Sequence, residues 1–377
     1  MTDRSIDLVS AGHMCLDITP AFLLSSASRS MEQLLRPGTL VVVDPPSISS
    51  GGGAANVGLS ALRLGFSVAL MGKCGDDLLG HALLDVLKRF GPAAAAGMRV
   101  ISGEHTSYTI VLAPPGADRM FLHCPGANDT FVADDVDLDL VGKARLFYFG
   151  YPPVMKAMRA DKGAPLADLL GRVKGRGVTT VLDMAMPDPA SESGQTDWRD
   201  ICCSVLPHVD LFVPSVAELL FMLDRGEYDR MVAAGDILDQ LSADLLRDLS
   251  SACLEMGAAV VMIKCGHRGL YVRTAGGERL ETMGSAVAPE HWARREHFAC
   301  AYRVDRVASG AGAGDSAVAG FLGGLLRGVD LTATADYACA TGAQTVQVLD
   351  TVSGVRSWDE TTGQLSAPRV APAIRLN

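Results

Sequence analysis

The chain alternates short apolar segments with stretches of helical pattern, and this alternation limits the possible folds more than any other feature. Six segments have the length and composition of buried strands: 6–11, 68–72, 146–149, 179–184, 211–214 and 259–264. Helical patterns lie between them, at 54–64, 76–90, 164–175 and 215–224. Strands that are apolar on both sides are typical of a parallel sheet covered by helices on each face. The sequence therefore predicts an α/β fold.

Three further segments, 39–44, 106–112 and 120–123, have strand-like composition but do not fit this alternation. The last two flank the turn sequence APPGADR, which predicts a β-hairpin. We expect a small β lid over a cleft, with an edge extension of the main sheet as the alternative. The expected division is a core of 1–34, 51–98 and 126–377, and a lid of 35–50 and 99–125.

Composition excludes several classes of function. With 48% hydrophobic residues among 377, a sizeable core is expected, and the net charge of −10 argues against nonspecific nucleic-acid binding. No apolar run approaches the ~18 residues of a membrane helix, and the first fifteen residues lack a signal-peptide core. Nine cysteines without disulfide-like spacing indicate reduced thiols. We therefore expect a cytoplasmic protein without nucleic-acid or membrane partners.

A glycine-rich loop, ASGAGAGDSAVAGFL at 308–322, leads into an apolar helical pattern and carries one carboxylate, Asp315. Glycine permits close backbone approach, and a helix start offers unpaired N–H groups to an anion. A carboxylate beside such a site suits the abstraction of a proton, although Asp is also a favoured N-cap. The segment also fits the loose dinucleotide pattern G-x-G-x-x-A, with Asp336 downstream. Its late position in the chain disfavours that oxidoreductase alternative.

A second glycine motif, GGGAANVGLSALRLG at 51–65, places Asn56 in the first turn of a helix. Together with GKCGDDLLG at 72–80 and GAGD at 312–315, it resembles the PfkB, or ribokinase-like, family of sugar and nucleoside kinases. Four more segments match the family's landmarks in order: GHMCLDIT at 12–19, CPGAND at 124–129, PSVAE at 214–218 and IKCGHRG at 263–269. The resemblance covers nearly the whole chain.

The resemblance implies a Rossmann-like three-layer α/β/α sandwich with a mostly parallel central sheet and a small β-strand lid. It also implies transfer of the γ-phosphoryl group of ATP, with Mg²⁺, to a hydroxyl of a sugar or nucleoside. The chain contains no GxxxxGK[ST] loop, so a Walker-type NTPase is not expected. By the resemblance, Asp315 is the general base, and the N–H groups of Gly312, Ala313 and Gly314 form the anion hole.

Other roles follow only from the resemblance. The substrate would be bound by Asp17, Gly52, Gly53 and Asn56. The nucleotide would be bound by Ser215, Lys264, Gly266, Gly269, Gly312 and Gly314, and would border 340–343. Glu218 would organise Mg²⁺ through water, since this ion keeps much of its hydration shell.

The chain departs from the family pattern at several positions. Ser309 and Gly310 stand where the family loop commonly has Asp-Thr, so we expect weak or absent activation by potassium. Ser215 replaces an Asn, and Lys264 replaces a Thr, where an ammonium could reach ATP phosphates or lie in solvent at a strand end. Gly53 and the segment 150–151 replace the Lys and Glu of ribokinases proper, so ribose is not a safe prediction.

Four functions remain open on the sequence. The first is a sugar kinase, with a nucleoside kinase of the same fold as its alternative. A catalytically silent metabolite-binding protein and, less favoured, a dinucleotide-dependent oxidoreductase are the others. Arg119, Phe121 and His123 of the expected lid either pack there or contact the substrate. Apolar lid segments also suggest a homodimer formed through the lid.

Overall fold

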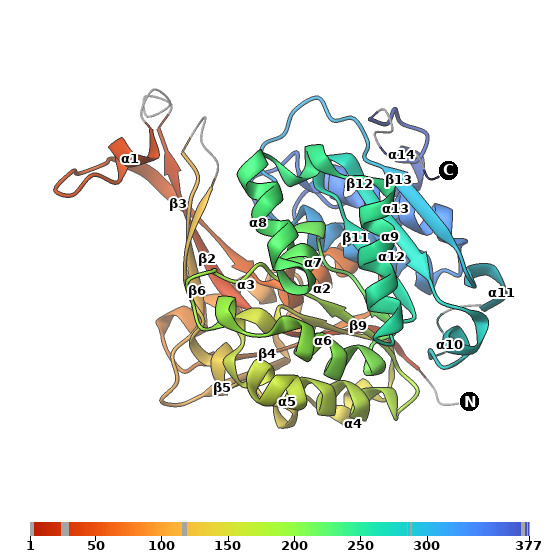
Figure 1. Ribbon diagram of the computed structural model, residues 1–377. Helices are drawn as coiled ribbons and strands as arrows, with labels where there is room; N and C mark the ends of the chain where they lie inside the picture. The colour runs from red at the N-terminus through yellow and green to blue at the C-terminus, as the bar shows by residue number, and fades with distance from the viewer. Residues whose placement is uncertain are drawn as a thin grey trace.

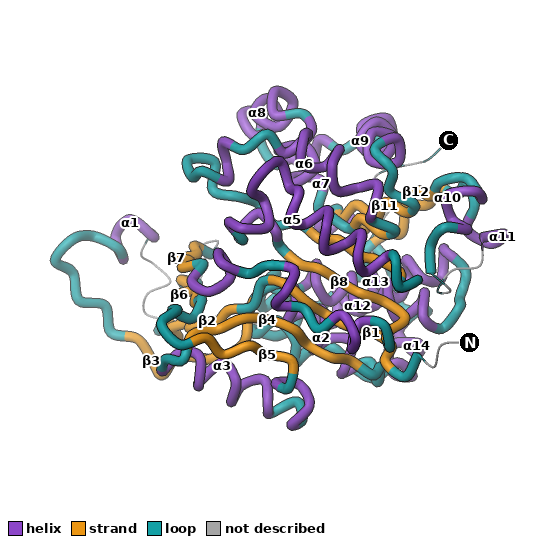
Figure 2. Tube along the Cα trace, turned by 90° about the horizontal axis from the view of Figure 1, so that it is seen from below, coloured by secondary structure: helices purple, strands orange, loops and turns teal. Residues whose placement is uncertain are grey.

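The computed structural model describes residues 4–23, 30–114, 119–284, 286, 289–370, 374 and 376. A nine-stranded sheet crosses the molecule in the order β13-β12-β11-β10-β9-β8-β1-β4-β5 (Figures 1 and 2). Its strands are β1 (Ile6–Gly12), β4 (Val68–Gly75), β5 (Gly97–Ile101), β8 (Ala144–Gly150), β9 (Thr179–Asp183), β10 (Leu211–Phe212), β11 (Val260–Lys264), β12 (Gly269–Thr274) and β13 (Glu296–Cys300). The pairs from β11 to β5 are parallel, whereas β12 pairs antiparallel with both β11 and β13. The predicted α/β fold is confirmed.

Helices cover both faces of this sheet. One face carries α4 (Leu138–Val141), α5 (Lys156–Lys174), α6 (Trp198–Val205), α7 (Val216–Leu223), α8 (Arg225–Ala234) and α9 (Ala243–Glu255). The other carries α2 (Gly53–Arg63), α3 (Leu78–Lys88), α10 (Gly277–Glu281), α11 (Pro289–Trp292), α12 (Ala313–Leu326), α13 (Leu331–Thr345) and α14 (Trp358–Gln364). Successive strand residues serve opposite layers: Val9 packs with the first set and Leu8 with the second. The result is the predicted three-layer sandwich.

A separate four-stranded sheet, in the order β3-β2-β6-β7, stands beside the sandwich at the left of Figure 1. It comprises β2 (Cys15–Phe22), β3 (Val43–Gly51), β6 (Tyr108–Leu112) and β7 (Met120–Cys124), and the short helix α1 (Met31–Leu34) projects next to it. Strands β6 and β7 pair antiparallel, which confirms the hairpin, although its turn at 115–118 lies outside the described residues. We call this sheet the lid.

The lid differs in detail from the expectation. The predicted strand 39–44 begins only at Val43 and runs on through Pro45 and Pro46, which are tolerated because β3 is an edge strand. Strand β2 belongs to the small sheet, although the expected boundaries assign 1–34 to the core. Strand β5 extends the main sheet to Ile101, inside the expected lid range. The exact division between core and lid remains a prediction.

The parallel strands place several polar residues at one edge of the main sheet. Strands β1, β8 and β9 end in register at Gly12, Gly150 and Asp183, and β11 ends at Lys264 on the same side. Ligands of open α/β sheets bind beyond the carboxyl ends of the strands, so this edge is where a site is expected. Among the described residues, no helix is long and apolar enough to cross a membrane.

Candidate active site

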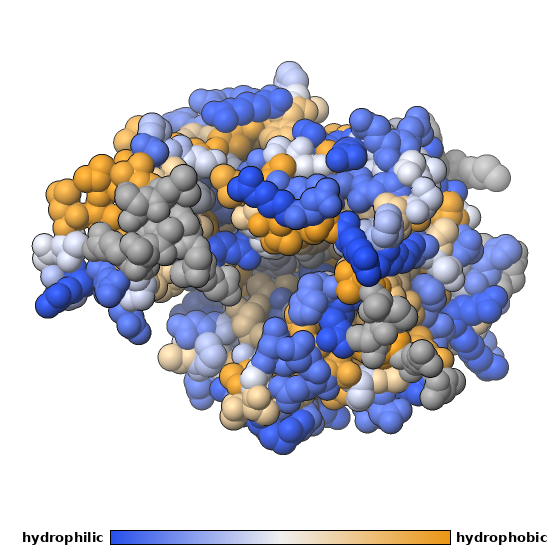
Figure 3. All heavy atoms as spheres, turned by 90° about the horizontal axis from the view of Figure 1, so that it is seen from above, coloured by the Kyte–Doolittle hydropathy of each residue, from blue (hydrophilic) through white to orange (hydrophobic). Residues whose placement is uncertain are grey.

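Two cavities lie on either side of the first turn of α12. The first, of about 770 Å³, is walled by the lid and by the carboxyl ends of β1 and β8, and it includes Gly312 and Asp315. The second, of about 630 Å³, includes Gly310, Ala313 and Gly314. The surface is hollowed between the lid and the core (Figure 3). The start of one helix therefore separates two spaces, each large enough for a small molecule.

Asp315 is 4% exposed and is held from two sides. Asn56 Nδ2 donates to Asp315 Oδ2 at 2.8 Å, and the Tyr151 hydroxyl donates to Asp315 Oδ1 at 2.6 Å. Burial, followed by the charge of Asp183, raises the pKa of Asp315 to about 6, against the opposing effects of Lys264 and the two hydrogen bonds. A carboxylate with such a pKa is a suitable general base near neutral pH.

The helix start itself is capped by backbone rather than by Asp315. Gly312 is the N-cap and has φ of 72°, a left-handed conformation that favours glycine, and a Cβ added there would lie 2.6 Å from Thr351. The alternative that Asp315 is merely the N-cap of α12 is therefore wrong. The Ala313 N–H points at the Gly310 carbonyl at 3.4 Å, a long and weak hydrogen bond, so this N–H remains available to a better acceptor.

Tyr151 is the site residue that sequence reasoning missed. It follows β8 with φ of 67°, which is uncommon for a residue other than glycine, and such conformations cluster at functional sites. A Cβ on Gly53 would lie 2.7 Å from the Tyr148 hydroxyl and 2.9 Å from the Tyr151 ring. Gly53 thus makes room for the tyrosine rings, and it is not among the residues that wall the first cavity. The available signal was the Tyr-Pro-Pro sequence directly after a buried strand.

The other residues expected to bind substrate lie in the first cavity. Burial raises the pKa of Asp17 to about 6, and a Cβ on neighbouring Gly51 would lie 2.3 Å from its carboxylate oxygens. Gly52 has φ of 89° and packs against His13. Asn56 donates to Asp315 and accepts a hydrogen bond from Thr351 at 2.8 Å, so its contacts fix the orientation of Asp315.

Most residues expected to bind the nucleotide lie in the second cavity, which is walled by Lys264, Gly266, Gly269, Gly314, Gly342 and Ala343. Lys264 is 12% exposed and its Nζ lies 2.7 Å from Asp183 Oδ1, so the alternative of a lysine in solvent is wrong. A Cβ on Gly314 would lie 3.3 Å from Lys264 Cδ. Gly269 has a further structural role, since a Cβ there would lie 2.0 Å from the Ala299 carbonyl oxygen.

Comparison with known proteins shows which family the chain belongs to. Residues 14–358 match the profile of the family described as pfkB family carbohydrate kinase. The chain belongs to the pfkB family. It is 32% identical to a fructokinase of Solanum tuberosum over 145 residues, which are 38% of this chain and 41% of the potato protein. It is also 32% identical to probable fructokinase-3 of Arabidopsis thaliana over 237 residues, 60% of this chain and 61% of that protein. Both matches span less than two thirds of the relatives.

The fold of this pfkB-family chain is similar to that of Arabidopsis thaliana ribokinase, solved in complex with ribose and ATP. The TM-score is 0.69 at 17% identity, with 96% of this chain and 99% of the ribokinase chain covered. The similarity extends to the three layers and the small sheet, and it confirms the predicted fold.

Three carboxylates affect the pKa of Lys264, although among the described residues they do not form a cluster whose oxygens all lie close enough to share one ion. Glu218 forms a capping box with Ser215, whose N–H donates to Glu218 Oε2 at 2.6 Å. Burial raises the pKa of Glu218 to about 7, with Lys264 opposing and Asp183 adding to the rise. Burial alone would lower the pKa of Lys264, but Asp183, Glu218 and Asp315 together raise it. Three carboxylates around one ammonium leave negative charge that Mg²⁺, which prefers oxygen ligands, would neutralise.

The lid of this pfkB-family chain reaches the α12 loop. Arg119, Phe121 and His123 all face the first cavity, and Arg119 Nη1 donates to Ser309 Oγ at 3.1 Å. Ser309 Oγ also accepts from the Ala311 N–H at 3.1 Å. An arginine of the lid therefore contacts the loop immediately before the helix start, at the position where the family commonly has a carboxylate.

Proposed function

We propose that this chain transfers the γ-phosphoryl group of ATP to a hydroxyl of a sugar or sugar-like molecule. The observation that carries the proposal is the position of Asp315 and the first turn of α12 between two cavities. The acceptor occupies the first cavity, where Asp315 lies, and the nucleotide occupies the second, where Gly314 and Lys264 lie. The bond between phosphorus and the acceptor oxygen then forms at the helix start.

Each residue has a distinct role in this mechanism. Asp315 takes the proton of the acceptor hydroxyl as that oxygen attacks phosphorus, while Asn56 and Tyr151 hold the carboxylate in place. The N–H groups of the first turn stabilise the negative charge on the phosphoryl oxygens. Lys264, supported by Asp183, contributes a fixed positive charge. Glu218 would hold Mg²⁺ through water, and the ion would neutralise charge on the ATP phosphates.

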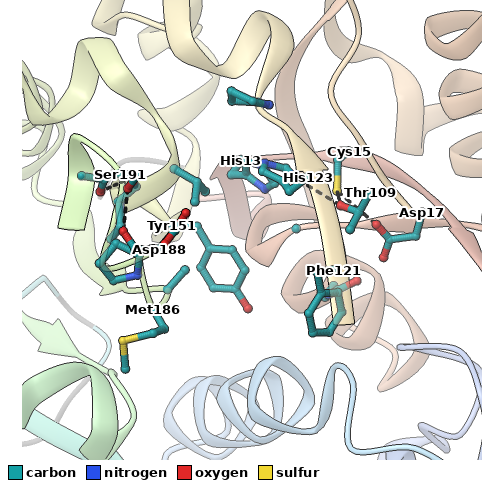
Figure 4. Close-up of a pocket in the computed structure, with 18 of the residues that line it drawn as sticks. His13, Cys15, Asp17, Thr109, Phe121, His123, Tyr151, Met186, Asp188 and Ser191 are labelled. Carbon is teal, nitrogen blue, oxygen red and sulfur yellow. Dashed lines mark hydrogen bonds between the residues drawn. The ribbon is translucent and has the colours of Figure 1, made fainter. Parts of the chain in front are cut away.

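The acceptor is proposed as a sugar because the first cavity presents several hydrogen-bonding groups. Asp17, Thr109 and His123 lie along one wall, which suits a molecule with several hydroxyls (Figure 4). Fructose is the first candidate, since the relatives that are 32% identical are named fructokinases. A nucleoside is the second candidate, because the Phe121 ring faces the same cavity and could stack on a base.

A coupled assay of ADP release tests the proposal over fructose, ribose, their phosphates and nucleosides. We expect turnover with one class of acceptor, and a loss of about 10²–10⁴-fold in Asp315→Asn, the range for loss of a general base. Asp168→Asn, an exposed change on α5 across the sheet, is the matched control and should keep full activity. Near-full activity of Asp315→Asn would remove the base from the mechanism. Nucleotide binding without turnover on any acceptor would favour the silent metabolite-binding alternative.

We further propose that the chain forms a homodimer through the lid. Register places Ile48, Ile18, Ile110 and Leu122 side by side across the four strands. Ile48 and Leu122 are 43% and 48% exposed, so part of this row is open to a partner. Light scattering should give a dimer for the native protein and a monomer for Leu122→Lys. A native monomer at micromolar concentration would contradict this assembly.

A further inference from the structure

Two imidazoles and a thiol meet on the lid side of the first cavity. The ligand atoms of His13, Cys15 and His123 all lie within 4.8 Å of one another. We propose that these three side chains form a binding site for a borderline-soft divalent cation such as Zn²⁺. Hydrogen bonds already join the imidazoles to each other, and join Cys15 and His123 to Thr109, so the three potential ligands are held close together.

The fold fixes this arrangement through strand register. Asp17 pairs with Thr109 on β6, and Thr109 pairs with His123 on β7, so the three side chains form a row on one face of the lid. Cys15 lies two residues before Asp17 on β2 and therefore shares that face. His13 comes from the end of β1 and meets the row from the core side. Figure 4 shows these side chains together on one wall of the cavity.

The distance between the imidazoles suits a zinc ion. His13 Nε2 lies 3.3 Å from His123 Nε2. Zinc–nitrogen bonds of about 2.0–2.1 Å at a tetrahedral angle separate two nitrogens by roughly 3.3–3.4 Å. One ion can therefore bind both nitrogens with little movement of the rings. The Cys15 sulfur can then serve as the third protein ligand. The remaining position faces the cavity, where water or a carboxylate oxygen of Asp17 is available.

The hydrogen bonds of the two imidazoles are compatible with a metal. His13 Nε2 and His123 Nε2 share a hydrogen bond, which an ion placed between them would replace. His13 Nδ1 is buried, and among the described residues no group hydrogen-bonds to it, so this nitrogen can carry the ring proton when Nε2 binds an ion. Cys15 Sγ donates to Asp17 Oδ1 at 3.3 Å, which gives the thiol proton an acceptor when a metal displaces it.

The ligand types separate this site from the magnesium site proposed near Glu218. Imidazole and thiolate select zinc-like ions, whereas Mg²⁺ prefers oxygen ligands. A cation at this wall would occupy the space beside Asp17 and Thr109. If the proposed function is correct, sugar and Zn²⁺ therefore compete for the cavity, but metal binding itself does not depend on that function.

The experiment uses the full chain, reduced, free of metal and without an affinity tag. Zn²⁺ alone is titrated against a chromophoric chelator, and Co²⁺ is used as a spectroscopic probe. We expect one high-affinity ion per chain and a near-ultraviolet thiolate-to-cobalt charge-transfer band. Cys15→Ser should abolish that band, and His123→Gln should weaken zinc binding by at least about tenfold, as expected for loss of one ligand. Cys203→Ser and His81→Gln, at exposed positions, are the matched controls. They should change neither the cobalt charge-transfer band nor the zinc affinity.

Thermal unfolding of the metal-free variants shows whether each is folded. X-ray absorption of the native zinc complex needs no variant and should show one sulfur ligand. A zinc complex without sulfur, or zinc affinity unchanged in both Cys15→Ser and His123→Gln, would overturn the proposal. Kinase activity is measured separately without Zn²⁺, so an inactive kinase that binds zinc contradicts only the proposed function.

Discussion

The hydrogen bond from Tyr151 to Asp315 predicts how the rate depends on pH. At 2.6 Å, this bond stabilises the ionised form of a carboxylate whose pKa is already raised to about 6 by burial. A hydrogen bond to a charged group contributes about 1.5–3 kcal/mol, and one pKa unit corresponds to about 1.4 kcal/mol. Tyr151→Phe removes the hydroxyl and keeps the ring, so the pKa of Asp315 should rise by about 1–2 units.

The consequence is a displaced acid limb in the pH profile of kcat/KM. At pH 7 the ionised fraction of Asp315 would fall from about 90% to about 10–50%, and at pH 9 activity should return to within about twofold of the native enzyme. The assay is ADP release at several sugar concentrations from pH 5 to 9. Tyr148→Phe is the matched control, because the Tyr148 hydroxyl donates to Asp183 at 3.3 Å and not to Asp315.

The reasoning fails if the acid limb of Tyr151→Phe stays in place. A uniform loss of rate at every pH would mean that the hydroxyl contacts the acceptor rather than setting the proton affinity of Asp315. If the acid limb of the pH profile moves by the same amount in Tyr148→Phe, the shift comes from general repacking of the residues around Asp315. Melting temperatures of both variants at pH 7 identify any loss of fold.

Three further predictions use the same site. Folding raises the pKa of Asp315 from 3.8 to about 6, so the ionised carboxylate destabilises the folded protein above pH 6. Asp315→Asn should therefore raise the free energy of unfolding by about 1–3 kcal/mol at pH 8. Denaturant titrations should show this gain disappearing as the pH falls from 6 to 4. Gly314→Ala places a methyl group 3.3 Å from Lys264 Cδ, in the proposed nucleotide cavity, so the KM for ATP should rise about tenfold. The melting temperature should be unchanged or higher, because alanine favours a helix more than glycine does. An unchanged KM would contradict the proposed position of the nucleotide. Arg119 donates to Ser309 where the family commonly has a carboxylate, so replacing sodium by potassium should leave the rate unchanged, and strong activation would refute this.

The main sheet could be predicted because its signal is local. Each parallel strand is buried on both faces, so a run such as Leu211–Phe212 between helical patterns is visible without knowledge of its neighbours. The lid was harder to delimit. Residues 39–42 have strand-like composition, but the structure starts β3 at Val43, and β2 pairs with β3 and β6 rather than with the main sheet. Pairing between distant segments decides those boundaries.

The order of the motifs was enough to find the glycine loops and Asp315. It was not enough to find the side chains that contact Asp315 and Lys264. Tyr151 reaches Asp315 only because a left-handed backbone at the end of β8 turns the ring toward α12, 164 residues away in sequence. Lys264 was placed in solvent as one alternative because its partner, Asp183, ends a different strand. The contacts of Tyr151 with Asp315 and of Lys264 with Asp183 depend on which strands are neighbours in the sheet. The composition of the chain carries no information on this strand order.

The charges at this edge lead to a last prediction, the dependence of nucleotide binding on Mg²⁺. Lys264 is the cation that contacts Asp183, while the carboxylates of Asp315 and Glu218 lie near enough to raise its pKa. One ammonium cannot balance Asp183, Asp315 and a partly ionised Glu218, and the ATP phosphates would bring further negative charge into partly buried surroundings where screening is weak. We therefore expect ATP to raise the melting temperature with Mg²⁺ and to have little effect in excess EDTA. Glu218→Gln removes one carboxylate and should reduce this difference, whereas equal stabilisation by ATP with and without Mg²⁺ would show that the helix start and Lys264 suffice.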